Sequence, residues 1–148
     1  FIGLRFFIIY GSHGRPDMFL FKLLKSIFKK NSFYLNNYGN HLRDFTHVDD
    51  VKMIIKKLID KKIKTKFQIF NVCSNNPISI LRLISDVSKI TSTNPKIVKV
   101  KRHKADVLKT HGSNIKIKKY LNIKIFRNIF EELLPIVNWY RDKKFYKY

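Results

Sequence analysis

The sequence predicts an α/β fold, and three observations lead to that prediction. Short apolar runs rich in β-branched and aromatic residues lie at 4–10, 67–72 and 97–100, as expected of buried strands. Segments with apolar residues at helical spacing separate these runs. Hydrophobic residues make up 45% of the 148 residues, which is enough for a packed core. Strands that alternate with helices are typical of the α/β class.

The first part of the chain predicts a strand, a helix and an extended segment. We expect the run at 4–10 to be a strand buried on both faces, followed by a polar loop at 11–15. Pro16 and Asp17 suit the first turn of a helix. The apolar face of that helix would contain Phe21, Leu24 and Phe28, and a short extended segment at 33–39 would end at Gly39.

A second helix is predicted to begin at Thr46. Thr46 and Asp49 have the Ser/Thr-x-x-acid spacing of a helix start, and the helix dipole favours Asp49 and Asp50 in the first turn. The spacing of the apolar residues predicts a buried stripe along one side of this helix. That stripe would consist of Val51, Ile54, Ile55, Leu58 and Ile59.

The second half of the chain continues the alternation. A strand at 67–72 precedes a turn at 75–77, and Ser79 is expected to cap the next helix. Another strand is expected at 97–100, and two helices at 114–121 and about 128–142, with Pro135 inside the last. The inward residues of the helix after Ser79 would be Ile80, Leu83, Ile84 and Val87. We find no internal repeat or linker.

The charge of the chain is strongly positive. It has 31 Lys and Arg against 10 Asp and Glu, a formal net charge of +21, which normally indicates a nucleic acid or another anionic surface as partner. Lysines are, however, spread along the sequence and outnumber arginines. The favoured residues Lys, Ile, Phe, Asn and Tyr also share AT-rich codons, so a nucleotide bias accounts for the charge. We therefore do not expect nucleic acid to be the partner.

Cysteine content and hydropathy bear on where the protein works. Cys73 is the only cysteine, which excludes an intramolecular disulfide framework and suits the reducing cytoplasm. Arg5 and Lys22 interrupt the best candidates for a membrane helix, which needs about 20 apolar residues, so no membrane segment is expected. The chain starts at Phe1 rather than Met, and we expect further sequence upstream.

Generic catalytic patterns are weak in this sequence. The five histidines lack a convincing metal-ligand spacing, so no metal site is expected. Gly11 and Gly14 lack the third glycine and the Lys-Ser/Thr pair of a phosphate-binding loop. Two Tyr-x-x-x-Lys spacings, starting at Tyr120 and Tyr140, are attributed to chance because tyrosine and lysine are abundant.

Five collinear segments nevertheless form a specific pattern. Residues 4–18, LRFFIIYGSHGRPDM, resemble the LRFFTVYGPxGRPDM segment of UDP-glucuronate 4-epimerases, which are NAD-dependent epimerases and dehydratases of the extended short-chain dehydrogenase/reductase type. NYGN at 37–40 with RDFTHVDD at 43–50 is similar to NYGxxxRDFTYVDD. Residues 70–77 are similar to YNIGNxxPV, residues 106–110 to GDVxxT, and residues 138–140 to the closing DWY.

The resemblance covers the C-terminal half of the family's length or less. It implies the last strands of a Rossmann-type parallel sheet, at 1–11 and 67–73, within a C-terminal substrate-binding portion spanning 1–148. In the family, the catalytic Ser/Thr and the Tyr-x-x-x-Lys pair precede this region, so we expect no catalytic residue here and no activity from these residues alone. The intact protein would convert UDP-glucuronate to UDP-galacturonate by transient C4 oxidation with NAD. It would be a homodimer that binds NAD mostly through the missing half.

The resemblance also implies roles for particular residues. Arg15 would face the hexuronate carboxylate, Arg43 the nucleotide diphosphate, and Arg102 the phosphates. Residues 33–37 would cradle uracil, and Lys22 is a plausible phosphate neighbour. The backbone at Phe7, Ile8 and Tyr10 would lie beside the nicotinamide.

Departures from the family leave alternatives open. Ile8 replaces a threonine, which favours a related epimerase or dehydratase that acts on an uncharged nucleotide sugar, although Arg15 opposes that interpretation. Ser12 replaces a proline. A degraded fragment or a basic nucleic-acid-binding module are the remaining alternatives.

Overall fold

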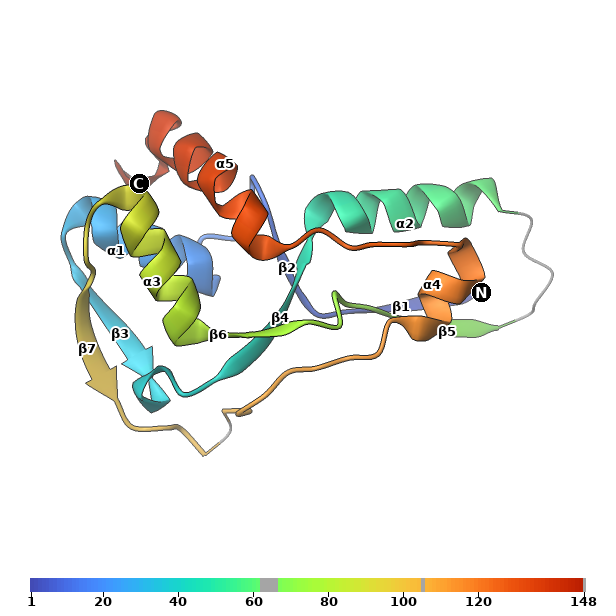
Figure 1. Cartoon of the computed structure of the whole chain (residues 1–148), viewed down its shortest axis with the longest axis horizontal. Helices are drawn as coiled ribbons and strands as arrows, with labels where there is room; N and C mark the ends of the chain where they lie inside the picture. Colours follow the sequence, from blue (N-terminus) through green and yellow to red (C-terminus); the bar gives the residue numbers. More distant parts are fainter. Residues whose placement is uncertain (62–66, 105, 148) are drawn as a thin grey trace.

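The computed structural model describes residues 1–61, 67–104 and 106–147. Within them, three pairs of parallel strands alternate with helices, which confirms the predicted α/β class (Figure 1). The strands are β1 (Ile2–Phe6), β2 (Ile8–Tyr10), β3 (Ser32–Asn36), β4 (Leu42–His47), β5 (Gln68–Val72), β6 (Pro77–Ser79) and β7 (Lys96–Val100). The helices are α1 (Phe19–Lys29), α2 (Val48–Asp60), α3 (Ile80–Thr91), α4 (Ile115–Leu121) and α5 (Ile129–Asp142), with 3-10 turns η1 (Asn37–Gly39) and η2 (Phe145–Lys147).

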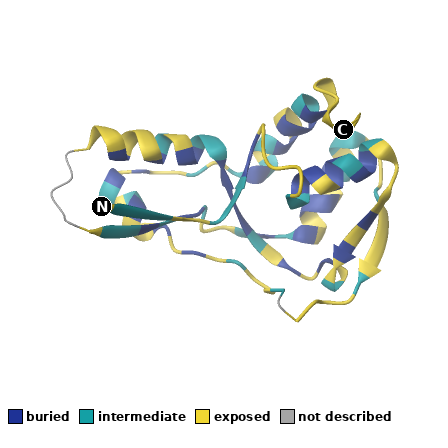
Figure 2. Cartoon of the chain, turned by 180° about the vertical axis from the view of Figure 1, so that it is seen from behind, coloured by how far each residue is buried: buried dark blue, intermediate teal, exposed yellow. Residues whose placement is uncertain are grey.

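The molecule is elongated (Figure 1), and its described residues form two hydrophobic cores. The smaller core lies where α2 and α4 pack on the parallel pair β1·β5, and it includes Ile54, Phe70 and Ile117. The larger core lies among α1, α3, α5 and β3, and it includes Leu23, Leu83 and Leu133. Strands β2, β4 and β6 connect the two ends, and Tyr10, Phe45 and Ile78 on these strands belong to the larger core. Figure 2 shows that residues coloured as buried occur on the helices and strands at both ends.

Strand pairing sets the position of the loop that follows β2. Strand β2 runs parallel to β4, with Tyr10 opposite His47. Gly11 then turns the chain with a φ of 141°, a backbone angle that L side chains rarely adopt. A Cβ atom at Gly11 would also lie 2.5 Å from Cγ1 of Val48. A glycine is therefore required where β2 ends beside the first residue of α2.

The predicted strand at 4–10 is wrong in two respects. It forms two strands, β1 and β2, which are interrupted at Phe7 and pair with different partners. It is also not buried on both faces, because Phe6 is 46% exposed and the remaining β1 residues are at most half-buried. Within the described residues β5 is the only strand paired with β1, so much of this strand stays accessible.

Two predicted helix starts are also corrected. Helix α1 begins at Phe19, and Pro16 and Asp17 instead lie in a turn closed by the bond from the Met18 N–H to the Arg15 carbonyl. Helix α2 begins at Val48 and is capped by His47, whose Nδ1 accepts a hydrogen bond from the Asp49 N–H. Thr46 cannot be the cap because it is part of β4, in register with β2.

The buried stripe of α2 is narrower than predicted. Val51, Ile54 and Leu58 are buried, whereas Ile55 and Ile59 are 40% and 78% exposed because only one side of α2 faces the sheet and α4. Helix α3 agrees with the sequence: Ser79 caps it by accepting from the Arg82 N–H. All four predicted inward residues of α3 are buried. Helix α5 runs through Pro135.

Candidate functional site

A cavity of about 260 Å³ opens between the larger core and the connecting strands. Its walls come from β2, β3, α1 with the turn before it, β4 with the residue before it, and the first residue of α3, with one residue from the segment after β7. The lining residues are Ile8, Asp17, Phe19, Lys22, Phe33, Tyr34, Leu35, Asn36, His41, Arg43, Phe45, Ile80 and Asp106. Segments far apart in sequence therefore meet here, including the predicted residues Arg43 and Lys22 and most of the predicted segment 33–37.

Arg43 supplies a fixed positive charge to this cavity. Its Nη1 donates to the carbonyls of Leu42, at 3.0 Å, and Leu108, at 3.2 Å. Burial lowers the pKa of the Arg43 guanidinium, and nearby Asp106 opposes that shift, but an arginine remains charged at neutral pH. Among the described residues, both hydrogen bonds of this guanidinium use Nη1 and none uses Nε or Nη2.

Two further polar residues of this cavity were missed by the sequence analysis. His41 Nε2 and one carboxylate oxygen of Asp106 are buried and have no hydrogen-bond partner among the described residues. Burial, followed by the charge of Arg43, lowers the pKa of His41, so its imidazole is neutral at pH 7. The only sequence signal for His41 was its position two residues before Arg43.

Arg15 lies in a second, neighbouring cavity of about 450 Å³. This cavity is formed by β2, the loop 11–15 and the start of α2, and Ile8 borders both cavities. Arg15 makes a bidentate contact with the carboxylate of Asp17, with Nε 3.0 Å from Oδ1 and Nη2 2.6 Å from Oδ2. The hydrogen bond from Arg15 lowers the pKa of Asp17. Arg15 therefore borders the second cavity, whereas Asp17 borders the first.

The three residues predicted beside the nicotinamide, Phe7, Ile8 and Tyr10, all line the second cavity. The Tyr10 side chain is nevertheless buried, with its ring edge-on to Phe45 and His47. Burial raises the pKa of the Tyr10 phenol, and its hydroxyl has no hydrogen-bond partner among the described residues. Tyr10 is therefore an anchor of β2, and the backbone is the part of it that a ligand could contact.

Arg102 is the predicted residue that the structure does not bring into either cavity. It is exposed on the segment after β7. Its charge contributes to the lowered pKa of His41, a residue that lines the first cavity. Its predicted contact with phosphates stays a prediction.

Asp44, next to Arg43, holds the surrounding loops in place. Its carboxylate is completely buried and accepts three hydrogen bonds: from the Ser74 N–H at 3.0 Å, the Ser74 hydroxyl at 2.6 Å and the Asn75 N–H at 3.0 Å. The Asp44 N–H donates to the hydroxyl of Thr110 at 3.1 Å. These contacts join β4 to the turn after β5 and to the segment that carries Leu108.

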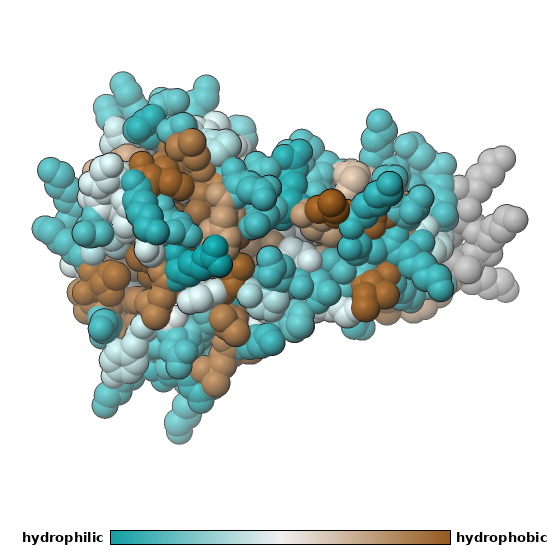
Figure 3. Space-filling model, viewed as in Figure 1, coloured by the Kyte–Doolittle hydropathy of each residue, from teal (hydrophilic) through white to brown (hydrophobic). Residues whose placement is uncertain are grey.

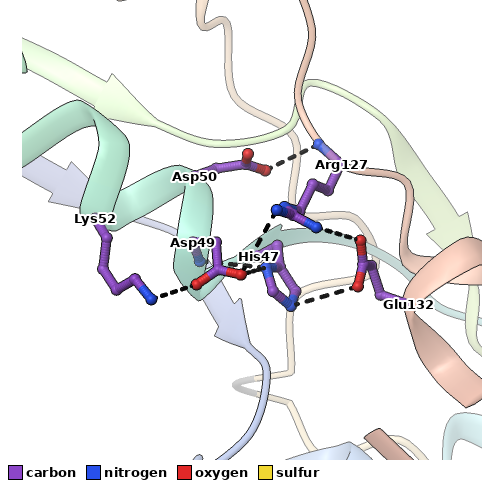
Figure 4. A network of polar contacts seen from close by, with 6 residues as sticks. All are labelled: His47, Asp49, Asp50, Lys52, Arg127 and Glu132. Carbon is purple, nitrogen blue, oxygen red and sulfur yellow. Dashed lines mark hydrogen bonds and ion pairs between the residues drawn. The ribbon is translucent and has the colours of Figure 1, made fainter. Parts of the chain in front are cut away.

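A polar network joins the start of α2 to the start of α5 (Figure 4). Arg127 donates from its backbone N–H to Asp50 at 2.9 Å and from Nη1 to Glu132 at 2.8 Å. Asp49 pairs with Lys52 and lies 3.6 Å from Nδ1 of His47. Asp49 and Asp50 thus lie in the first turn of α2, as the sequence predicted. Asp50 also accepts the hydrogen bond that holds the segment before α5.

The described residues give no sign of two other kinds of site. They contain no group of three or more His, Cys, Asp and Glu side chains that could hold a metal ion. Among them, no helix is both long and apolar enough to cross a bilayer.

Hydrophilic residues are distributed over both ends of the face in Figure 3 rather than massed at one place.

Comparison with known proteins places the cavities in context. The model of the NAD dependent epimerase/dehydratase family matches residues 1–73. An uncharacterized protein of Methanocaldococcus jannaschii is 36% identical, over 97% of this chain and 43% of its own length. The UDP-glucuronate 4-epimerase of Thermodesulfobacterium geofontis is 34% identical, over 94% of this chain and 42% of its own length.

Solved structures give the same result for the fold. MoeE5 in complex with UDP-glucuronic acid and NAD matches with a TM-score of 0.90 and 25% identity, covering 96% of this chain and 47% of MoeE5. The UDP-glucuronic acid 4-epimerase of Bacillus cereus matches with a TM-score of 0.87 and 23% identity, over 95% of this chain and 45% of that enzyme. The chain thus spans less than half the length of the relatives it matches.

Proposed function

We propose that this chain is a member of the NAD-dependent epimerase/dehydratase family, whose model matches residues 1–73, and that it forms the nucleotide-sugar-binding part of a UDP-glucuronate 4-epimerase. The complete protein would oxidise the sugar at C4 with NAD and return the hydride to the opposite face. The groups that move the proton of the C4 hydroxyl would lie outside these residues, so residues 1–148 alone would be inactive. Strands β1, β2 and β5 would belong to the Rossmann sheet of the complete protein.

The observation that carries this proposal is the chemistry gathered in the first cavity. A planar guanidinium binds a diphosphate through two parallel hydrogen bonds, and Arg43 offers its unbonded edge there. Lys22 adds a second positive charge, and Phe33 and Tyr34 offer flat apolar surfaces beside it. A uracil base next to β3 and a diphosphate next to Arg43 would satisfy these groups together.

The second cavity suits the sugar and the nicotinamide. Its β2 wall is mostly apolar and ends at Gly11, so planar rings can lie against the backbone of Phe7, Ile8 and Tyr10. NAD, when bound, supplies the hydride acceptor and donor. Arg15 borders this cavity and would hold the hexuronate carboxylate.

Calorimetric titration of the full polypeptide that contains residues 1–148 tests the proposal. We expect UDP and UDP-glucuronate to bind, and Arg43→Ala to weaken both by about 10- to 100-fold, the value of one charge-assisted hydrogen bond. Arg141→Ala is the matched control, because it removes an equal charge from an exposed arginine on α5. Equal effects of the two substitutions would contradict a diphosphate contact at Arg43.

One observation favours a second candidate, an enzyme for an uncharged nucleotide sugar. Ile8 borders both cavities, where it offers an aliphatic surface rather than a hydroxyl to a ligand. MoeE5 has also been solved with UDP-glucose and NAD. Turnover of UDP-glucose without turnover of UDP-glucuronate would favour this candidate.

The assembly and location of the complete protein are also proposals. The resemblance to the epimerases supports a homodimer, which light scattering of the purified polypeptide would test. The single cysteine supports a cytoplasmic location. The spread of the lysines supports the expectation that nucleic acid is not a partner.

A further inference from the structure

The contact between Arg15 and Asp17 joins residues that border different cavities. Asp17 faces the cavity of Arg43, whereas Arg15 faces the cavity of β2. The contact uses Nε and Nη2, with Nη2 only 2.6 Å from Oδ2. The Asp17 carboxylate therefore already occupies the Nε–Nη2 edge of Arg15, one of the two edges at which a guanidinium binds a carboxylate side-on.

The backbone turn at residues 15–18 favours this contact. Pro16 lies between the two residues and has its φ fixed by the ring. The Met18 N–H donates to the Arg15 carbonyl at 3.1 Å, which closes a turn around Pro16. The two side chains are thus presented on one side of a short, closed loop.

We propose that Asp17 is an internal competitor for Arg15, which a ligand carboxylate must displace. This inference rests on the proposed function, since it takes Arg15 as the group that selects a charged sugar. Asp17 would then set how strongly the site prefers a hexuronate over an uncharged hexose. An uncharged sugar would leave the Arg15–Asp17 pair intact, whereas a hexuronate would exchange one carboxylate for another.

Exposure makes the exchange easy. The Arg15 and Asp17 side chains are 70% and 56% exposed, and ion pairs of this kind are weak because water screens them. Lys22 lies near enough to lower the pKa of Asp17, so a positive charge remains beside Asp17 after Arg15 turns away. The competition should therefore cost a hexuronate ligand no more than about fivefold in affinity.

The experiment compares UDP-glucuronate, UDP-glucose and UDP in the full polypeptide with NAD present. Asp17→Asn removes the competing charge, and we expect it to tighten UDP-glucuronate binding by about two- to fivefold relative to UDP-glucose. Asp86→Asn is the matched control, because Asp86 also pairs with an exposed arginine, Arg82, and borders neither cavity.

A double substitution separates competition from simple repulsion. Asp17 also faces the first cavity, so its removal could favour every anionic ligand equally. In the Arg15→Ala background, Asp17→Asn should leave the ratio of UDP-glucuronate to UDP-glucose affinities unchanged. An unchanged ratio in the single Asp17→Asn variant would overturn the proposal. A shift that persists without Arg15 would do so as well. Failure to bind UDP at all would instead refute the proposed function.

Discussion

Replacing Asp44 by asparagine tests how the site is held together. The Asp44 Oδ1 accepts from the N–H and hydroxyl of Ser74, and the Oδ2 accepts from the Asn75 N–H. An asparagine side chain keeps one oxygen but must place an NH₂ group against one of these donors. The substitution therefore loses at least one charge-assisted hydrogen bond and leaves one buried donor unpaired.

The expected cost follows from these contacts. A hydrogen bond to a charged group contributes about 1.5–3 kcal/mol, and an unpaired buried donor costs about 1–3 kcal/mol. Since these terms overlap, we expect Asp44→Asn to lower the free energy of unfolding by about 2–4 kcal/mol. Urea denaturation of the full polypeptide measures it, with the exposed Asp142→Asn as control. A loss within about 0.5 kcal/mol of the control would refute the assigned role of Asp44.

Three further predictions concern β2, the buried thiol and the carboxylate site. Gly11→Ala should destabilise the protein by about 1–3 kcal/mol in urea, because of its φ and the approach to Val48, whereas Gly3→Ala, with ordinary contacts at 3.5 Å, should not. Burial raises the pKa of Cys73 to about 11 from an ordinary 9.0. The contribution of the buried neutral thiol to the free energy of unfolding is therefore fully present below pH 9 and is lost between pH 9 and about 11. Between those pH values, Cys73→Ala should reduce the slope of the free energy of unfolding against pH by up to about 1.4 kcal/mol per pH unit. An unchanged slope would be evidence against a raised thiol pKa. Arg15→Ala should weaken UDP-glucuronate binding more than UDP binding in calorimetry, and an equal loss for both would rule out a carboxylate contact.

Local sequence signals predicted much of the fold. Ser79 and the apolar spacing behind it define α3 within a few residues of sequence, and the structure confirms both. The spacing of Thr46 to Asp49 fits a capping box and predicts that α2 begins at Thr46. Pairing of β4 with β2 extends the strand through His47 instead, and such long-range pairing has no local signal.

The same limit applies to the site. Motif resemblance indicated Arg15 and Arg43, and both border cavities. The carboxylate of Asp44 takes its donors from about 30 residues away. The segment that carries Asp106 is brought to Arg43 by the carbonyl of Leu108. These contacts depend on the folded arrangement of distant segments, so the sequence could not reveal them.

The most direct test of the account is a crystal structure of the full polypeptide with NAD and UDP-glucuronate. We predict that the diphosphate lies within hydrogen-bonding distance of the Arg43 guanidinium and that the uracil lies against β3. The sugar carboxylate should contact Arg15, with Asp17 released. A nucleotide sugar bound away from both cavities would contradict the proposed role of this chain.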